Sequence, residues 1–422
     1  MQITFQNYKT VDIDNIPITG EWDLPDRKEN KMHSIHAYPA KFPAFITEKK
    51  IKKSEDSGLL IQNVADVFCG CGTVSYETVR LGKHFWGCDI NPVATLIART
   101  KSQAYDDTKL QDFYERIIEK YNNVECDKSN EVYGNKRIHY WFDEHHINDL
   151  LRLRTAVYDT VEKGKYCDFF LCAFSNILKP CSKWLTKSIK PQVDPAKHPK
   201  EVLSAFQEQI RKMLLANHEN TITNDKLAVI EQVNILEKEF DEPMVDLVVT
   251  SPPYVTSYEY ADLHQLSTLW LGYSDDYTAY REGSIGSKFH AEEFSENAKH
   301  LNEVGQNVVF QLYGKSKSQA KAAAQYYVDM QKVSKKVYSM LRQAGECLFV
   351  IGNTEYKGVK MDNARQLMEA LLESGFRDVE IDRRKISNKI LSPYRDATGK
   401  FTKANLGCRK IYSEEFIVSA KK

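Results

Sequence analysis

The sequence lacks the features of several protein classes. Its nine cysteines are an odd number and none has the C-x-x-C spacing of a zinc site, which argues against a disulfide framework and a structural metal. No apolar run approaches the ~18 residues of a membrane span, and the first ten residues, MQITFQNYKT, lack the apolar core of a signal peptide. We therefore expect a cytoplasmic protein with no metal and no membrane partner.

Net charge is also absent, because 58 basic residues balance 58 acidic ones. Any binding to nucleic acid must then use a local basic patch and not a global field. The G-K-[ST] ending of a phosphate-binding loop is missing as well, which argues against hydrolysis of nucleoside triphosphates. The length of 422 residues predicts either one large domain with an insertion or two domains.

What the sequence does contain is an alternation of short apolar runs with amphipathic helical patterns. Helical patterns at 326–345 and 361–375 each end at a glycine. Continuous apolar strands separated by helices are typical of a mainly parallel sheet covered on both faces. The six runs typical of strands are 64–68, 84–88, 227–233, 245–250, 346–352 and 415–420.

The interval 101–225 interrupts this alternation. It holds helical patterns at 109–121, 147–161 and 200–216. Its length far exceeds an ordinary connection of a few residues. We predict a helical insertion here, between a first part of the core in 1–100 and a second part in 226–422.

The stretch DVFCGCGTVSYETVRLG (66–82) predicts a strand, a turn and a helix. Gly70 and Gly72 allow a ligand to approach the backbone, and the N-terminus of the following helix favours a carboxylate or phosphate. Asp89 ends the next strand, where an acid suits hydrogen bonds from ribose hydroxyls. Together they favour an adenosine-bearing ligand of unspecified kind. The alternative is that the glycines only form a tight turn and Asp89 only caps a helix.

The stretch TSPPY (250–254) follows the apolar run VDLVV. Two prolines fix φ and remove two backbone donors, so carbonyls are left as acceptors. Two acceptors against an exocyclic amine can draw its nitrogen toward tetrahedral geometry and free its lone pair; Ser251 Oγ and the Pro252 carbonyl are the candidates. Tyr254 offers a face for a base rotated out of its stack, worth ~1–3 kcal/mol. The alternative is a rigid loop in which Tyr254 only packs.

These motifs, in this order, resemble those of the S-adenosylmethionine-dependent DNA amino-methyltransferases. Their strand plus F-x-G-x-G-T is matched at 68–73, and their [D/N/S]-P-P-[Y/F/W] is matched at 251–254. The Ser form is usual in enzymes that methylate N4 of cytosine, and the Asp and Asn forms in those that methylate N6 of adenine. The resemblance implies a Rossmann-like class I methyltransferase fold. That fold has a doubly wound, mostly parallel seven-stranded sheet, here with the helical insertion.

The resemblance also implies site residues. The stretch HSIHAYPAKFPAFI (33–46) is similar to an N-terminal cofactor motif of some members, and Asn234 stands where members often carry an acid. An amide oxygen can accept the same hydrogen bond, although an ordinary turn residue is an equal alternative. The catalytic residues implied are Ser251, Pro252, Pro253 and Tyr254. Those implied for the cofactor are Tyr38, Lys41, Phe42, Asp66, Phe68, Gly70, Gly72, Thr73, Asp89, Ile90 and Asn234.

Three segments are candidates for contact with DNA. The segment 179–200 holds six lysines against one aspartate and includes Trp184, which favours an extended, exposed loop that contacts phosphates; a solvated loop is the alternative. The aromatics of 254–273 either flank the base pocket or pack a helix on the sheet. The segment 281–294 contains two glycines and is a candidate for a mobile loop over DNA. The lysines proposed to contact DNA are Lys183, Lys187 and Lys190.

The sequence thus predicts a site-specific methyltransferase that modifies N4 of a flipped cytosine in double-stranded DNA, with S-adenosylmethionine as cofactor. The setting implied is bacterial restriction–modification or a related defence system, with a cognate restriction endonuclease or other defence subunits as partners. The alternatives are N6-adenine methylation, methylation of RNA or protein, and a catalytically silent DNA-binding subunit. The intact turn at 70–72, Asp89 and the motif at 251–254 argue against the silent subunit.

Overall fold

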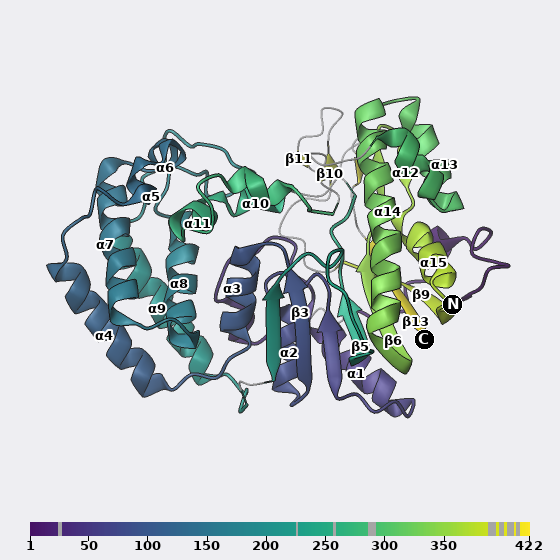
Figure 1. Cartoon of the computed structure of the whole chain (residues 1–422), viewed down its shortest axis with the longest axis horizontal. Coiled ribbons are helices and arrows are strands. Elements are labelled where there is room, and N and C mark those ends of the chain that lie inside the picture. The colour runs from purple at the N-terminus through teal and green to yellow at the C-terminus, as the bar shows by residue number, and fades with distance from the viewer. Residues whose placement is uncertain are drawn as a thin grey trace.

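The fold consists of a central sheet with helices on both faces and a helical insertion beside it (Figure 1). The computed structural model describes residues 1–23, 28–224, 227–255, 259–285, 293–386 and 414–422. It also describes the backbone of three two-residue strands, β10 (Tyr394–Arg395), β11 (Phe401–Thr402) and β12 (Arg409–Lys410). Among these residues no helix is both long and apolar enough to cross a bilayer.

The central sheet has eight strands, in the order β1-β9-β13-β6-β5-β2-β3-β4. The run from β6 to β4 is parallel, whereas β13 pairs antiparallel with both of its neighbours and β1 pairs antiparallel with β9. In sheet order the strands are Gln2–Ile3, Arg377–Lys385, Glu414–Lys421, Leu341–Ile351, Val245–Thr250, Asn63–Asp66, His84–Asp89 and Ala228–Gln232. This confirms the Rossmann-like, doubly wound α/β fold. Seven strands were expected, and the eighth is the two-residue edge strand β1.

Both faces of the sheet are covered, which explains why β5 is buried along its whole length and apolar at four of its six positions. Val64, Leu247 and Val350 pack on one side against α1, α2 and α3. Val248 and Phe349 pack on the other side against α13, α14 and α15. These helices are α1 Ala44–Asp56, α2 Thr73–Arg80, α3 Pro92–Lys101, α13 Glu303–Tyr313, α14 Lys317–Met340 and α15 Asn363–Glu373; the short α12 spans Phe294–His300.

One predicted helix boundary is wrong. The helical pattern at 326–345 continues past the true end of α14, since β6 begins at Leu341 directly after it. Gly345 lies inside β6, where a Cβ would come within 2.8 Å of the Arg342 carbonyl oxygen and 3.1 Å of the Asp246 carbonyl oxygen. This glycine therefore permits close strand packing and does not end a helix. The helix at 361–375 does end as predicted, with Gly375 at φ +99°.

The interval 101–225 is helical, as predicted, and packs beside α3 (Figure 1). One long helix, α8, was not predicted from the sequence, and ten of its fourteen residues are buried. Its Phe174 belongs to the same buried cluster as Val64 of the sheet, so insertion and sheet share one core. The division at residues 100 and 225 stays a proposal. The helices are α4 Asp107–Asn123, α5 Glu131–Gly134, α6 Lys136–Trp141, α7 Glu144–Thr160, α8 Lys165–Leu178 and α9 Val202–His218.

Candidate active site

The candidate site lies where the strand order reverses. From β2 the chain builds outward to β3 and β4 on one side, and then to β5 and β6 on the other. Ligands of open α/β sheets bind at the carboxyl ends of the strands at such a point. The glycine turn follows β2 and the Ser-Pro-Pro-Tyr corner follows β5, so two motifs far apart in the sequence meet at one edge.

The glycine turn depends on a backbone that only glycine adopts easily. Gly70 has φ +46° and Gly72 has φ +72°, both in the left-handed region. A Cβ on Gly72 would lie 2.6 Å from the Cα of Ala98, so this glycine lets α3 pack on the turn. Gly70 and Phe68 remain half-buried, whereas Gly72 and Thr73 are buried. The exposed part of the turn is therefore its first half.

Asp89 holds the turn from the neighbouring strand. Its Oδ2 accepts a hydrogen bond from the Gly70 amide at 3.0 Å, and its Oδ1 accepts one from the Asn91 amide at 2.9 Å. Burial raises the pKa of the Asp89 carboxyl to about 6. A carboxylate has about four acceptor positions, so the half-buried Asp89 retains capacity for ribose hydroxyls. Ile90 beside it is also half-buried.

Asp66 connects the two motifs. Its Oδ1 accepts hydrogen bonds from Thr250 Oγ1 at 2.5 Å and from the Phe68 amide at 3.0 Å. Only 3% of Asp66 is exposed, and burial raises the pKa of its carboxyl to about 7. A direct contact between Asp66 and the cofactor was expected. In the structure this carboxyl group ties the turn to the residue before Ser251 and so positions the two motifs; its contact with the cofactor stays a prediction.

The Ser-Pro-Pro-Tyr corner leaves Ser251 half-buried, with Pro252 buried behind it. Ser251 Oγ donates to the carbonyl oxygen of Val350 in β6 at 3.0 Å. Because its one hydrogen is used there, the lone pairs of Oγ are what the hydroxyl can offer to another group. The geometry therefore suits the acceptor role expected of Ser251.

Tyr254 is held at both ends of its ring. Its hydroxyl donates to Glu415 Oε1 in β13 at 3.2 Å, and Glu415 in turn pairs with the buried Arg384 at 3.0 Å. A Cβ on Gly352 would lie 2.8 Å from Tyr254 Cε2, so the ring rests directly on that glycine. The half-buried ring thus rests on Gly352, directly after β6, and bonds to Glu415 of β13 and to Ser251 of its own corner.

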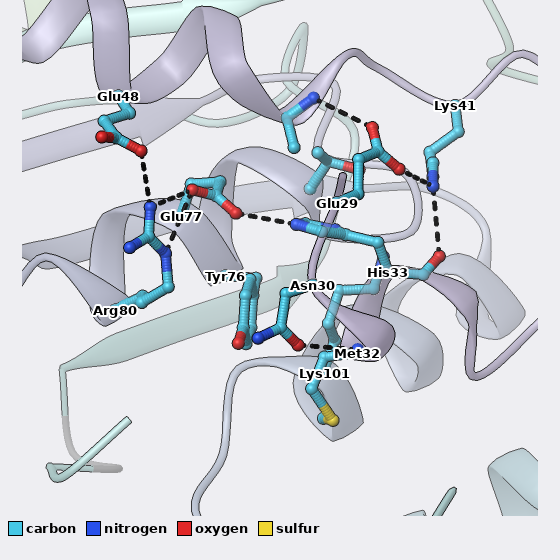
Figure 2. A network of polar contacts seen from close by, with 12 residues as sticks. Glu29, Asn30, Met32, His33, Lys41, Glu48, Tyr76, Glu77, Arg80 and Lys101 are labelled. Carbon is cyan, nitrogen blue, oxygen red and sulfur yellow. Dashed lines mark hydrogen bonds and ion pairs between the residues drawn. The ribbon is translucent and has the colours of Figure 1, made fainter. Parts of the chain in front are cut away.

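The segment 33–46 crosses the same edge of the sheet. The hydroxyl of Tyr38 is 3.3 Å from where a Cβ of Gly70 would stand, and its ring stacks on Tyr260 at 6.1 Å. Lys41 points elsewhere: its Nζ donates to Glu29 at 2.5 Å and to the His33 carbonyl at 3.3 Å (Figure 2). Of the expected residues here, Tyr38 reaches the turn, Lys41 serves an ion pair, and Phe42 packs on the core.

A buried network anchors this segment to α2. His33 Nε2 lies 2.8 Å from Glu77 Oε1, and Arg80 binds both Glu77 at 2.6 Å and Glu48 of α1 at 2.7 Å (Figure 2). These contacts join the segment before Tyr38 to the helix that starts in the glycine turn. They explain how a loop keeps Tyr38 beside Gly70.

Comparisons with known proteins agree with these motifs. A family model described as DNA methylase matches residues 3–100. The type II methyltransferase M.MvaI of Kocuria varians is 25% identical over 397 residues, which cover 87% of each chain. The chain is thus similar to DNA methylases over its first hundred residues, and to M.MvaI over most of its length. M.MjaII, a type II methyltransferase of Methanocaldococcus jannaschii, is 34% identical over 97 residues, which cover 22% of this chain and 18% of that protein.

Two solved structures match most of this chain at low similarity. A SAM-dependent methyltransferase from Methanosarcina mazei has 10% identity and a TM-score of 0.29, covering 92% of this chain and 98% of that one. The rRNA methyltransferase aviRa from Streptomyces viridochromogenes has 10% identity and a TM-score of 0.30, covering 92% and 88%. Scores at this level leave the fold to be judged from the strand order above.

The match of residues 3–100 to the DNA methylase model indicates S-adenosylmethionine as the cofactor. The residues present fit it: Gly70 is half-buried, and Asp89 keeps acceptor positions beside it. Asn234 lies two residues beyond β4, whose Gln232 pairs with Asp89. Asn234 Oδ1 accepts a hydrogen bond from the backbone amide of Leu236 at 3.1 Å, and Asn234 Nδ2 donates to the carbonyl oxygen of Gly283 at 3.3 Å.

The lysine-rich segment 179–200 is more closely packed than the extended, exposed loop that was expected. Trp184 is 2% exposed and stacks on Trp141 at 5.0 Å. Lys197 turns inward and donates to the Trp184 carbonyl at 2.8 Å. The lysine-rich composition did not predict this packing. The aliphatic part of a lysine side chain can cover apolar surface while its ammonium group binds an acceptor.

The three lysines proposed for DNA contact differ in their surroundings. Lys183 pairs with Asp143 at 2.8 Å, whereas Lys187 and Lys190 are exposed. Residues 254–273 form α10 (Tyr260–Leu263) and α11 (Gln265–Trp270), apart from 256–258, which lie outside the described residues. Most of the proposed mobile loop, 286–292, also lies outside the described residues.

Sequence analysis missed one pair of residues at this site, Asn91 and His264. Asn91 Nδ2 lies 2.7 Å from His264 Nδ1, and the His264 ring is 5.2 Å from that of Tyr38. Asn-Pro before a helix is a capping signal that draws attention to Asn91. His264 lies within the aromatic segment 254–273 named above, but no local pattern marks the histidine itself.

Proposed function

We propose that this protein transfers a methyl group from S-adenosylmethionine to the exocyclic N4 amine of a flipped cytosine in double-stranded DNA, within a specific sequence. The observation that carries the proposal is the placement of Ser251. Its Oγ has given its hydrogen to Val350, and the residue before it is tied through Asp66 to the glycine turn. An acceptor for an amine thus stands beside the turn expected to bind the cofactor.

The chemistry asked of the chain is modest. When bound, S-adenosylmethionine supplies an electrophilic methyl group. The lone pair of a cytosine amine is delocalised into its ring, so the amine is a poor nucleophile until that delocalisation is broken. Ser251 Oγ and the Pro252 carbonyl accept the two N–H groups and so pull the nitrogen toward tetrahedral geometry. The amine loses one proton overall, and no covalent bond to Ser251 is needed.

Tyr254 supplies the surface for the base in this proposal. Rotating a base out of the duplex costs a few kcal/mol, and stacking on an aromatic ring returns ~1–3 kcal/mol. The ring is fixed by Gly352 and Glu415, so little conformational freedom is lost when a base stacks on it. A fixed platform is better suited to this than a ring on a loose loop.

In the same proposal the insertion 101–225 contacts DNA and takes part in target recognition, while 1–100 and 226–422 form the catalytic core. Lys187 and Lys190 are exposed on the insertion and available to phosphates. The similarity to M.MvaI supports a role in restriction–modification, with a cognate endonuclease as partner and the cytoplasm as location.

Nucleoside analysis after incubation with tritiated S-adenosylmethionine and mixed-sequence DNA tests the proposal. N4-methylcytosine is expected. N6-methyladenine would replace cytosine by adenine as the target, and labelled RNA or protein without labelled DNA would refute a DNA substrate. Cofactor binding without any transfer would indicate a silent subunit.

Replacing Ser251 with Ala gives the matched test of the corner. Turnover should fall by about 10-fold or more, because one of two acceptors for the amine is lost. Affinity for S-adenosylhomocysteine, measured by calorimetry, should change little. A large loss of that affinity would mean that Ser251 contacts the cofactor and not the base.

A further inference from the structure

His264 is a buried imidazole whose second nitrogen has no partner among the described residues. It lies between α10 and α11, shortly after the catalytic corner, and 5% of it is exposed. Nδ1 meets the side chain of Asn91, but Nε2 is buried with no hydrogen-bond partner in the described part of the chain. Buried polar groups of folded proteins nearly always have a partner.

The hydrogen-bond network decides which nitrogen carries the hydrogen. Asn91 caps α3: its Oδ1 accepts from the amides of Val93 at 3.0 Å and Ala94 at 3.4 Å. The oxygen is therefore committed, and the nitrogen Nδ2 faces His264. An amide N–H can only donate, so His264 Nδ1 accepts and the hydrogen sits on Nε2.

The ring also stays neutral. Burial, with a smaller contribution from His36, lowers the pKa of His264 to about 3. A neutral imidazole with Nδ1 accepting presents one fixed N–H donor through the physiological range. Such a donor suits an uncharged or anionic acceptor and would reject a second donor.

The surroundings of this donor are those of the expected cofactor site. Asn91 comes two residues after Asp89, whose carboxylate holds Gly70. The Tyr38 ring lies 5.2 Å from His264, and its hydroxyl lies 3.3 Å from where a Cβ of Gly70 would stand. Thus the glycine turn, Asp89, Tyr38 and His264 share one corner of the molecule.

We propose that the Nε2–H of His264 donates a hydrogen bond to an oxygen or ring-nitrogen acceptor of bound S-adenosylmethionine. The proposal rests on the proposed function and adds a binding residue that none of the sequence motifs includes. The side chain of Asn91 then has two roles. Its Oδ1 caps α3, and its Nδ2 sets the tautomer of His264.

The first test is NMR of the full chain labelled with ¹⁵N at histidine. S-adenosylhomocysteine, the demethylated product, serves as a probe that binds without reacting. On saturation, the Nε2–H proton of His264 should shift downfield and exchange more slowly with water, while Nδ1 keeps its acceptor signature. An unchanged Nε2–H in protein that calorimetry shows to be saturated would overturn the inference. Failure of the probe to bind at all would instead count against the proposed function.

Two variants separate the donor from its structural setting. His264→Phe keeps a ring of similar size and should weaken binding of S-adenosylhomocysteine about 10-fold, whereas His264→Gln, which offers an amide N–H, should retain most of the affinity. The exposed His145, replaced by Phe, is the matched control and should bind as the wild type does. Equal affinity of the Phe and wild-type proteins would refute the role of the donor.

A change at Asn91 tests the tautomer without touching the ring. Asn91→Asp retains a good helix cap, but a carboxylate can only accept, so His264 must turn its hydrogen to Nδ1. Nε2 then becomes an acceptor, and affinity for the probe should fall about as far as in His264→Phe. A reversed tautomer with wild-type affinity would show that Nε2 does not face the cofactor.

Discussion

The buried carboxyl of Asp66 should make the protein less stable as pH rises. Its pKa is raised from 3.8 to about 7 because burial penalises the charge. An acid with a higher pKa in the folded state binds more protons when folded, so stability is lost as pH rises from about 4 to about 7. Asp66→Asn removes this ionisation, while its amide oxygen can still accept from Thr250 and Phe68.

The size of the effect follows from the two pKa values. One pH unit corresponds to about 1.4 kcal/mol, so the cost of ionising Asp66 is about 2 kcal/mol at pH 5 and about 4 kcal/mol at pH 8.5. The free energy of unfolding of Asp66→Asn, relative to that of the wild type, should thus rise by about 2.5 kcal/mol between pH 5 and pH 8.5. A chain of 422 residues has an unfolding entropy of ~0.9 kcal/mol/K. Dividing the free-energy difference by this entropy gives a change of about 3 °C in the Tm difference between variant and wild type.

Calorimetric unfolding of the wild type and the variant at both pH values measures this difference. A constant cost of burying the amide cancels, because only the change with pH is compared. Asp112→Asn makes the same chemical change at a side chain that is 62% exposed and should show no such dependence. If the gap in Tm between wild type and Asp66→Asn were equal at both pH values, the ionisation of Asp66 would not be coupled to folding.

Two further predictions concern the base platform and the insertion. Gly352→Ala should displace the Tyr254 ring, because the new Cβ would stand 2.8 Å from Tyr254 Cε2. We expect turnover on DNA to fall about 10-fold or more, while affinity for S-adenosylhomocysteine is kept. Unchanged turnover would show that the position of the ring is unimportant. Lys187→Gln with Lys190→Gln should reduce the slope of log affinity for DNA against log salt by about 2. Lys183→Gln, where the lysine is already paired with Asp143, should change the slope less, and equal effects would contradict the assignment.

Local patterns were sufficient for the parts of the site that depend on backbone conformation. The prolines after β5 and the left-handed glycines after β2 act through their own φ angles, so their meaning is visible in the sequence. The strands β5 and β2 were visible for a similar reason, since burial on both faces requires an apolar run.

Contacts between distant residues were not visible. Thr250 binds Asp66 across 184 positions, and Asn91 binds His264 across 173. No local period indicates such a contact, so neither the bond between Asp66 and Thr250 nor the position of His264 was predicted. The lysine-rich segment was predicted to be exposed because of its composition. That composition gave no sign that Trp184 is buried.

The place of β13 in the sheet has a consequence for incomplete chains. This strand lies between β6 and β9, although it follows both in the sequence. A fragment that stops before residue 414 would present two open strand edges that invite self-association. It would also lack Glu415, so the aromatic platform would lose its anchor. Truncated products should therefore be both prone to aggregation and without this support for Tyr254.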